Sequence, residues 1–238
     1  MNLSFFELGR DNKKNILIIH GWASSKEKFR PLAQNLIRKG WRVIAIDLPG
    51  FGESPVPNLP LTVAGYTSVV GNFIQEIFGN KPFVVFGHSF GGRIAARISK
   101  GGKGVYGLVL CAPGAGGDNS FTALLYKVIA KIFLSLPAIR RVVLNKYYGR
   151  ASGFQRFILK GIRLDDPKKT FSGINVPVLI LWGTNDKVVP VDKVEALRKM
   201  IRRSLVRTFP KIGHSLPYHR GARLAQEITT WSSTFGRE

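Results

Sequence analysis

The amino-acid sequence predicts an α/β protein built on a mostly parallel central sheet, and three observations lead to this prediction. Continuous apolar runs, such as residues 15–19, are typical of strands that are covered on both faces. These runs alternate with segments of helical spacing, an order that gives parallel strands joined by right-handed crossovers. A length of 238 residues and a hydrophobic content of 45% fit one domain with a full core and a modest insertion.

The first half of the chain contains most of the predicted sheet. A short edge strand over residues 3–8 precedes a buried strand over 15–19, a helix over 29–39 that stops at Gly40, and a strand over 42–46. A proline-rich loop follows and leads to a helix over 62–78. The next strand begins at Phe83 and runs to the turn at Ser89. A helix to about Lys100 and a strand over 105–111 complete this half.

The regular alternation stops after Pro113 and resumes near residue 176. Residues 121–136 place apolar side chains on one helical face, and shorter helical patterns follow over 138–147 and 152–163. We therefore expect an α/β core of residues 1–113 and 173–238, with residues 114–172 inserted as a short helical lid over the carboxyl ends of the strands. The apolar face should pack on the core, with a membrane-facing or acyl-binding face as the alternative. Strands over 176–182 and 204–209 and helices over 191–201 and 220–235 end the chain.

Charge is the unusual feature of the composition. The 36 basic and 14 acidic residues give a net charge of +22, and residues 113–172 are the densest positive region, with 11 basic and 3 acidic side chains. Such a surface attracts polyanions. We expect a solvated basic surface, with an acidic partner protein or an anionic membrane surface as alternatives. Nucleic acid is disfavoured, because neither a recognition module nor interleaved stacking aromatics accompany the charge.

Other features bound the class of protein. The single cysteine, Cys111, excludes an internal disulfide and is expected to be a buried thiol at a strand end. No secretory signal is apparent at the start, and no apolar run approaches the ~20 residues of a membrane span, so a cytoplasmic location is expected. No paired metal-ligand spacing is present, and the glycines of residues 101–104 lack the spacing of a P-loop. We expect no metal and no cofactor.

The segment Gly87-His88-Ser89-Phe90-Gly91 matches the pattern G-x-S-x-G between a predicted strand and a predicted helix. A strand that turns into a helix within about two residues forces the middle residue into a strained backbone conformation. The flanking positions must be small, because chain passes close to chain there. The pattern predicts a nucleophilic Ser89 beside a helix N-terminus that favours developing negative charge.

A nucleophilic serine needs a histidine base that is held by a carboxylate, in the chain order serine, acid, histidine. His214, in the loop after the last strand, is the favoured base, because His219 is expected at the mouth of the terminal helix. Asp186, just past the strand that ends at Trp182, is the favoured acid. Its competitors are Asp192, expected to cap a helix, and Asp118, near the entrance of the lid.

Five motifs occur in a fixed order along the chain. They are His20-Gly21-Trp22, residues 47–54 (DLPGFGES), Gly87-His88-Ser89-Phe90-Gly91-Gly92, Trp182-Gly183-Thr184-Asn185-Asp186 with Pro190, and Gly213-His214. With them the chain resembles the α/β-hydrolase superfamily over almost its whole length. The resemblance is nearest to the single-domain branch with a helical lid. That branch includes small carboxylesterases, lactonases, C–C bond hydrolases of aromatic ring-fission products, and the carrier-protein methyl ester esterase of biotin synthesis.

The resemblance implies a catalytic triad and an oxyanion hole. Ser89 would be the nucleophile, His214 the base and then the acid, and Asp186 the residue that orients the base. The backbone N–H groups of Phe90 and Trp22 would form the oxyanion hole. A serine in place of an aspartate at the turn disfavours dehalogenase and epoxide hydrolase chemistry.

The resulting expectation is a serine hydrolase that cleaves small or medium acyl esters, and lactones, through an acyl-enzyme. One alternative uses the same triad on an ester linked to an acidic acyl carrier protein. Another is C–C bond hydrolysis, with Arg150 or Arg156 holding a substrate carboxylate. A third is a non-catalytic basic binding protein, against which the intact triad argues. His20 and His88 are expected to be structural.

Overall fold

The computed structural model describes residues 1–58, 61–101, 104–114 and 166–235, and its centre is a seven-stranded sheet. The strand order is β1-β3-β2-β4-β5-β6-β7. Only β1 (Phe5–Leu8) is antiparallel to its neighbour. The parallel strands are β2 (Lys14–Ile19), β3 (Trp41–Ile46), β4 (Phe83–His88), β5 (Val105–Cys111), β6 (Val178–Gly183) and β7 (Ser204–Phe209). The predicted mostly parallel sheet is confirmed.

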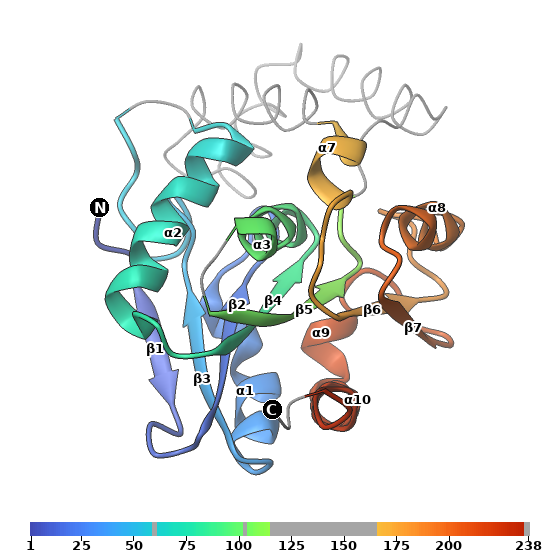
Figure 1. The fold of residues 1–238 in the computed structure, drawn as a ribbon, viewed down its shortest axis with the longest axis horizontal. Coiled ribbons are helices and arrows are strands. Elements are labelled where there is room, and N and C mark those ends of the chain that lie inside the picture. Colours follow the sequence, from blue (N-terminus) through green and yellow to red (C-terminus); the bar gives the residue numbers. More distant parts are fainter. Residues whose placement is uncertain (59–60, 102–103, 115–165, 236–238) are drawn as a thin grey trace, which may run out of the picture.

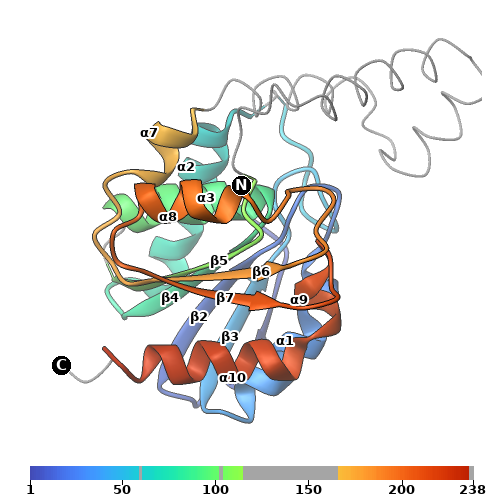
Figure 2. The same ribbon diagram turned by 90° about the vertical axis from the view of Figure 1, so that its right-hand side faces the viewer.

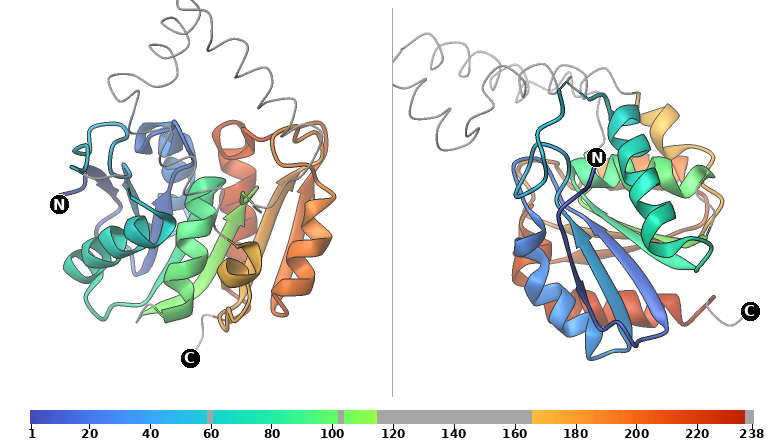
Figure 3. Two further views of the ribbon diagram at one scale, coloured as in Figure 1. Left: turned by 90° about the horizontal axis from the view of Figure 1, so that it is seen from above. Right: turned by 90° about the vertical axis from the view of Figure 1, so that its left-hand side faces the viewer.

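Helices cover both faces of the sheet and make three layers (Figures 1 and 2). One face carries α2 (Val63–Phe78), α3 (Phe90–Gly101), α7 (Pro167–Phe171) and α8 (Lys193–Met200). The other face carries α1 (Arg30–Ile37), α9 (Leu216–His219) and α10 (Gly221–Ser232). In Figure 3 the right-hand view shows the same separation, and the left-hand view looks onto the face that carries α2, α3, α7 and α8.

Each helical layer has its own hydrophobic core, and the strands contribute to both. In β2, Leu17 and Ile19 belong to the core under α2 and α3, whereas Ile16 and Ile18 belong to the core under α1 and α10. Successive side chains of a strand point to opposite faces, so a strand covered on both sides needs an uninterrupted apolar run. This explains why the sequence of β2 shows no alternation of apolar and polar residues.

The helix predicted over residues 29–39 differs from the observed structure at its start. A short 3-10 helix, Lys26–Phe29, comes first, and α1 begins at Arg30 with Pro31 in its first turn. Proline is favoured there, because its missing N–H has no acceptor inside the helix anyway. At the other end Gly40 adopts a φ of 80°, as expected of a residue that stops a helix.

Two predictions near the C-terminus also need correction. Asp192 occupies the position before α8, but its side chain makes no capping hydrogen bond. The helix predicted over 220–235 is α10 (Gly221–Ser232), and a separate short helix, α9, precedes it and ends at His219.

The predicted lid falls largely outside the described residues. These exclude 115–165, and therefore Asp118, Arg150 and Arg156 and the helices predicted there. Within the described part, α7 places the fully buried Phe171 in the core below α3. The division into a core and a lid over 114–172 remains a prediction.

Candidate active site

The turn between β4 and α3 holds Ser89 in a strained conformation. Its φ is 51°, a left-handed value that a residue with a side chain rarely adopts. A Cβ atom on Gly87 would lie 2.5 Å from the carbonyl oxygen of Gly91, and one on Gly91 would lie 2.4 Å from the carbonyl oxygen of His20. Both flanking positions therefore require glycine, and the tight turn predicted from G-x-S-x-G is present.

Asp186 and His214 lie on two neighbouring loops at the carboxyl edge of the sheet. Because β6 and β7 are adjacent and parallel, the loops after them leave the sheet side by side. The N–H of Asn185 donates to the carbonyl of Ile212 at 2.9 Å, which ties the two loops together. Topology thus brings together residues that are 28 positions apart in the sequence.

The side chains of Asp186 and His214 form a close hydrogen bond. Oδ2 of Asp186 lies 2.7 Å from Nδ1 of His214, and Oδ1 accepts from the backbone N–H groups of Val188 and Val189 at 2.8 and 2.9 Å. The carboxylate is fully buried, whereas 20% of the His214 side chain is exposed. A carboxylate can only accept, so Nδ1 carries the proton and Nε2 is left free to accept one.

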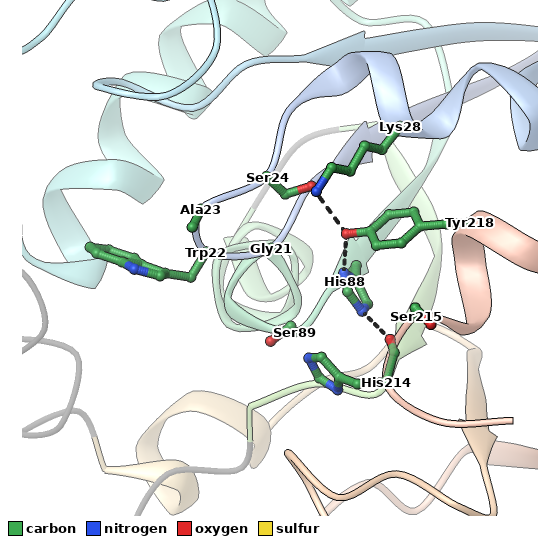
Figure 4. Close-up of a pocket in the computed structure, with 10 residues that line it drawn as sticks. All are labelled: Gly21, Trp22, Ala23, Ser24, Lys28, His88, Ser89, His214, Ser215 and Tyr218. Carbon is green, nitrogen blue, oxygen red and sulfur yellow. Dashed lines mark hydrogen bonds between the residues drawn. The ribbon is translucent and has the colours of Figure 1, made fainter. Parts of the chain in front are cut away.

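Ser89 and His214 line one pocket of about 330 Å³, and Figure 4 shows the imidazole of His214 beside the Ser89 side chain. Ten residues line this pocket: Gly21, Trp22, Ala23, Ser24, Lys28, His88, Ser89, His214, Ser215 and Tyr218. The loop after β2, the turn after β4 and the loop after β7 each contribute to it. The structure therefore brings together the predicted serine, histidine and aspartate.

The two predicted oxyanion-hole residues flank Ser89. Phe90 is the first residue of α3, so its N–H has no acceptor within the helix. Trp22 packs its ring against Phe90 at 5.7 Å and against Phe51 at 5.0 Å. A Cβ on the preceding Gly21 would lie 3.1 Å from Cβ of Ser89, so the Trp22 loop passes close to the serine.

His20 and a buried ion pair hold the Trp22 loop from beneath. His20 is fully buried, and Nδ1 contacts the carbonyl of Gly21 at 2.6 Å while Nε2 accepts from the N–H of Leu48 at 3.0 Å. Burial lowers the pKa of His20 to about 4. The predicted structural role of His20 agrees with these contacts.

The motif of residues 47–54 forms the other half of this support. The buried Asp47 accepts from the N–H and from Nζ of Lys26 at 2.7 and 2.8 Å, and from the N–H of Glu53 at 2.9 Å. A Cβ on Gly52 would lie 2.2 Å from the Asp47 carboxylate. The motif is therefore a clamp on the loop after β2. Sequence reasoning missed Lys26, which no local pattern distinguishes from an exposed lysine.

The remaining candidates lie away from this pocket or are inert. His219 is exposed at the end of α9. Cys111 is fully buried, and burial raises its pKa, so it is a structural thiol as predicted.

In the part of the chain that the structure describes, no group of three or more His, Cys, Asp or Glu side chains could hold a metal ion. Among the same residues, no helix is long and apolar enough to cross a membrane.

Comparison with known proteins agrees with the fold and defines the class. The sequence profile of the alpha/beta hydrolase family matches residues 16–227. The chain therefore belongs to the α/β-hydrolase family.

Individual relatives are distant. The chain is 23% identical to the uncharacterized hydrolase YugF of Bacillus subtilis, over 96% of this chain and 93% of that protein. It is 23% identical to monoacylglycerol lipase abhd6-B of Xenopus laevis, over 94% of this chain and 76% of that one. The crystal structure of a membrane phospholipase A, described as a bacterial virulence factor, aligns with a TM-score of 0.82 and 25% identity, over 99% and 84% of the two chains.

Proposed function

We propose that this hydrolase cleaves carboxylic esters through an acyl-enzyme, with Ser89 as nucleophile, His214 as general base and Asp186 as the residue that orients the base. The observation that supports this most strongly is the 2.7 Å bond between Asp186 and His214, next to a strained serine in the same pocket. This arrangement has the parts that nucleophilic catalysis by serine requires: a nucleophile, an adjacent base and a buried acid.

The proposed reaction has two halves. The Ser89 oxygen attacks the ester carbonyl carbon while its proton passes to Nε2 of His214. The tetrahedral intermediate then expels the alcohol, which takes that proton, and leaves an acyl group on Ser89. A water molecule, deprotonated by His214, attacks the acyl carbonyl and releases the carboxylic acid and free enzyme. The buried Asp186 carboxylate stabilises the imidazolium that forms in each half.

The N–H groups of Trp22 and Phe90 are proposed to stabilise the negative oxygen of the intermediate. Preorganised donors of this kind contribute about 10²–10³ in turnover each. The strained φ of Ser89 and the packing of Trp22 on Phe90 hold both main-chain segments next to the nucleophile. The hole then needs no rearrangement at the moment of reaction.

The proposed substrates are esters of small to medium acyl chains, and lactones. The pocket of about 330 Å³ lies at the low end of the range for ligand sites, which is about 300–1,000 Å³. A lipase and a phospholipase A among the similar proteins agree with ester chemistry. A non-catalytic scaffold protein would not need a carboxylate that is buried and hydrogen-bonded as Asp186 is.

A carrier-linked ester is the second candidate, because Lys28 is the one Lys or Arg among the described residues that line the pocket, and no Asp or Glu lines it with them. The positive charge of Lys28 would attract an acidic carrier protein to the pocket. Turnover of the carrier-linked ester would then fall steeply as the salt concentration rises. Equal salt dependence for carrier-linked and free esters removes this candidate.

C–C bond hydrolysis rests on Arg150 and Arg156, outside the described residues, and turnover of a vinylogous dienone acid tests it.

The deciding experiment compares wild type, Ser89→Ala and Ser99→Ala on a panel of p-nitrophenyl esters and lactones. Ser99 is buried in α3, and among the described residues its hydroxyl bonds only the carbonyl of Ala96 in its own helix, so it is the matched control. We expect ester turnover in wild type and Ser99→Ala and none above background in Ser89→Ala. Wild-type turnover in Ser89→Ala refutes the proposal.

A further inference from the structure

A series of hydrogen bonds joins the three chain segments that surround the pocket. Oη of Tyr218, in α9, lies 3.1 Å from Oγ of Ser24 and 3.1 Å from Nδ1 of His88. Nε2 of His88 lies 2.9 Å from the carbonyl oxygen of His214 (Figure 4). The series therefore runs from the Trp22 loop, through Tyr218 and the end of β4, to the main chain of His214.

The chemistry of the end group fixes the direction of every proton in this series. The carbonyl of His214 can only accept, so Nε2 of His88 carries the hydrogen. A neutral imidazole carries one N–H, so Nδ1 of His88 accepts, and the Tyr218 hydroxyl must donate to it. The oxygen of Tyr218 then accepts from the Ser24 hydroxyl. One proton arrangement satisfies all four groups.

The surroundings of His88 keep its ring neutral and in place. The residue is 3% exposed, and its ring packs against the ring of Tyr218 at 5.4 Å and that of Phe29 at 6.3 Å. Burial, together with the neighbouring His214, lowers the pKa of His88 to about 3. The rings of His88 and His214 are 4.9 Å apart, so a cationic His88 would oppose formation of the His214 imidazolium.

We propose that His88 is a positioning residue that fixes the main chain of His214, with Tyr218 and Ser24 holding His88 in the required orientation. The proposal rests on the proposed function, because it assigns a task relative to His214 as the base. Asp186 holds His214 at the side chain, and His88 holds the same residue at its carbonyl oxygen. With its side chain held by Asp186 and its carbonyl oxygen held by His88, His214 is restricted to one direction of its imidazole, toward Ser89.

The series also connects the base to the oxyanion loop. Ser24 lies two residues after Trp22, so the proposed donor of Trp22 and the proposed base share a single support. Catalytic groups must be held within about 0.5 Å of the productive geometry, and supporting hydrogen bonds provide that precision. A displacement of about 1 Å can cost roughly 10²-fold in turnover.

The test compares variants that differ in which contact they keep. Tyr218→Phe removes the hydroxyl and little volume. His88→Gln keeps a terminal N–H donor at a reach near that of Nε2, whereas the shorter His88→Asn cannot reach the His214 carbonyl. For each purified variant, active sites are titrated with a serine-directed phosphonate, and kcat per active site, KM and Tm are measured on one p-nitrophenyl ester.

We expect Tyr218→Phe and His88→Asn to lose about 10- to 100-fold in kcat per active site, with KM changed by less than about threefold. His88→Gln should regain part of the turnover lost in His88→Asn, because it keeps a donor for the His214 carbonyl although it loses the acceptor for Tyr218. In the His88→Gln background, Tyr218→Phe should have little further effect, because the acceptor Nδ1 is gone and the two substitutions share one path. Tyr106→Phe, a tyrosine in β5 outside the pocket, is the control and should match wild type.

Two results overturn the positioning role. One is a kcat per active site in Tyr218→Phe that equals that of Tyr106→Phe. The other is equal turnover in His88→Gln and His88→Asn, which would show that reach to the His214 carbonyl is irrelevant. Loss of active sites or of Tm alone, at unchanged kcat per site, assigns the series to folding and also overturns it. Ser89→Ala separates the two proposals, since its activity tests the function whatever Tyr218 does.

Discussion

Gly183, the last residue of β6, lies so close to Ile212 that a Cβ atom on it would be 2.3 Å from the Ile212 carbonyl oxygen. This approach brings the loop of Asp186 against the loop of His214. The obstacle is backbone, so it cannot yield by a change of rotamer.

We therefore expect Gly183→Ala to push the two loops apart. Ester turnover should fall at least tenfold, and the free energy of unfolding should fall by about 1–3 kcal/mol, as for overpacked sites. Gly71→Ala is the control, because a Cβ there meets nothing within 4 Å and α2 should gain about 0.5–1 kcal/mol. Urea unfolding and steady-state kinetics on both variants measure the effect. Wild-type turnover in Gly183→Ala contradicts the expected coupling of the loops.

Asp186→Asn keeps the size of the side chain but changes what it can do for His214. An amide that turns its NH₂ toward Nδ1 favours the wrong tautomer, and the corresponding exchange in a serine protease costs about 10⁴ in kcat. We expect a loss of that order with KM nearly unchanged. Asp192→Asn, on an exposed residue that makes no capping bond, serves as the comparison and should retain full turnover. Near-normal activity in Asp186→Asn would show that Asp186 is not the acid that orients His214.

Lys26→Met should destabilise the fold strongly. Lys26 and Asp47 are 4% and 1% exposed, and removal of one member of a buried pair leaves the other charge without compensation. Such losses are about 3–5 kcal/mol. The exposed pair of Arg198 and Glu195 offers the comparison, and Arg198→Met should cost less than about 1 kcal/mol. Denaturant unfolding measures the free energy of unfolding of both variants. Equal losses in Lys26→Met and Arg198→Met would show that the buried pair of Lys26 and Asp47 contributes little to stability.

Stability should fall when the pH drops from about 6.5 toward 4. In the folded chain the pKa of His20 is lowered to about 4 and that of His88 to about 3, against an ordinary value of 6.5. Between these values the unfolded chain binds protons that the folded chain does not, so acid favours unfolding. His20→Asn removes one of these groups, so its free energy of unfolding should change less between pH 7 and pH 5. If the free energy of unfolding changes equally with pH in wild type and in His20→Asn, His20 is not the buried, neutral group assigned here.

The arrangement of Ser89, Asp186 and His214 could be predicted because parallel strands place their carboxyl ends along one edge of the sheet. The order of strand ends in the sequence then indicates which loops can meet. Ser24, Lys26 and Tyr218 could not be found this way. Tyr218 bonds residues 194 and 130 positions away, and no local spacing encodes contacts of that kind.

Mapping the residue to which a serine-directed fluorophosphonate attaches shows whether Ser89 is the nucleophile. Intact and peptide mass spectrometry of the labelled protein should show one adduct, on Ser89, formed at the same rate at which ester cleavage disappears. His214→Ala should slow labelling by several orders of magnitude while the protein stays folded, since loss of a triad base can cost about 10⁶ in turnover. Ester cleavage that persists in the fully labelled protein, or an adduct on another residue, would show that Ser89 is not the nucleophile.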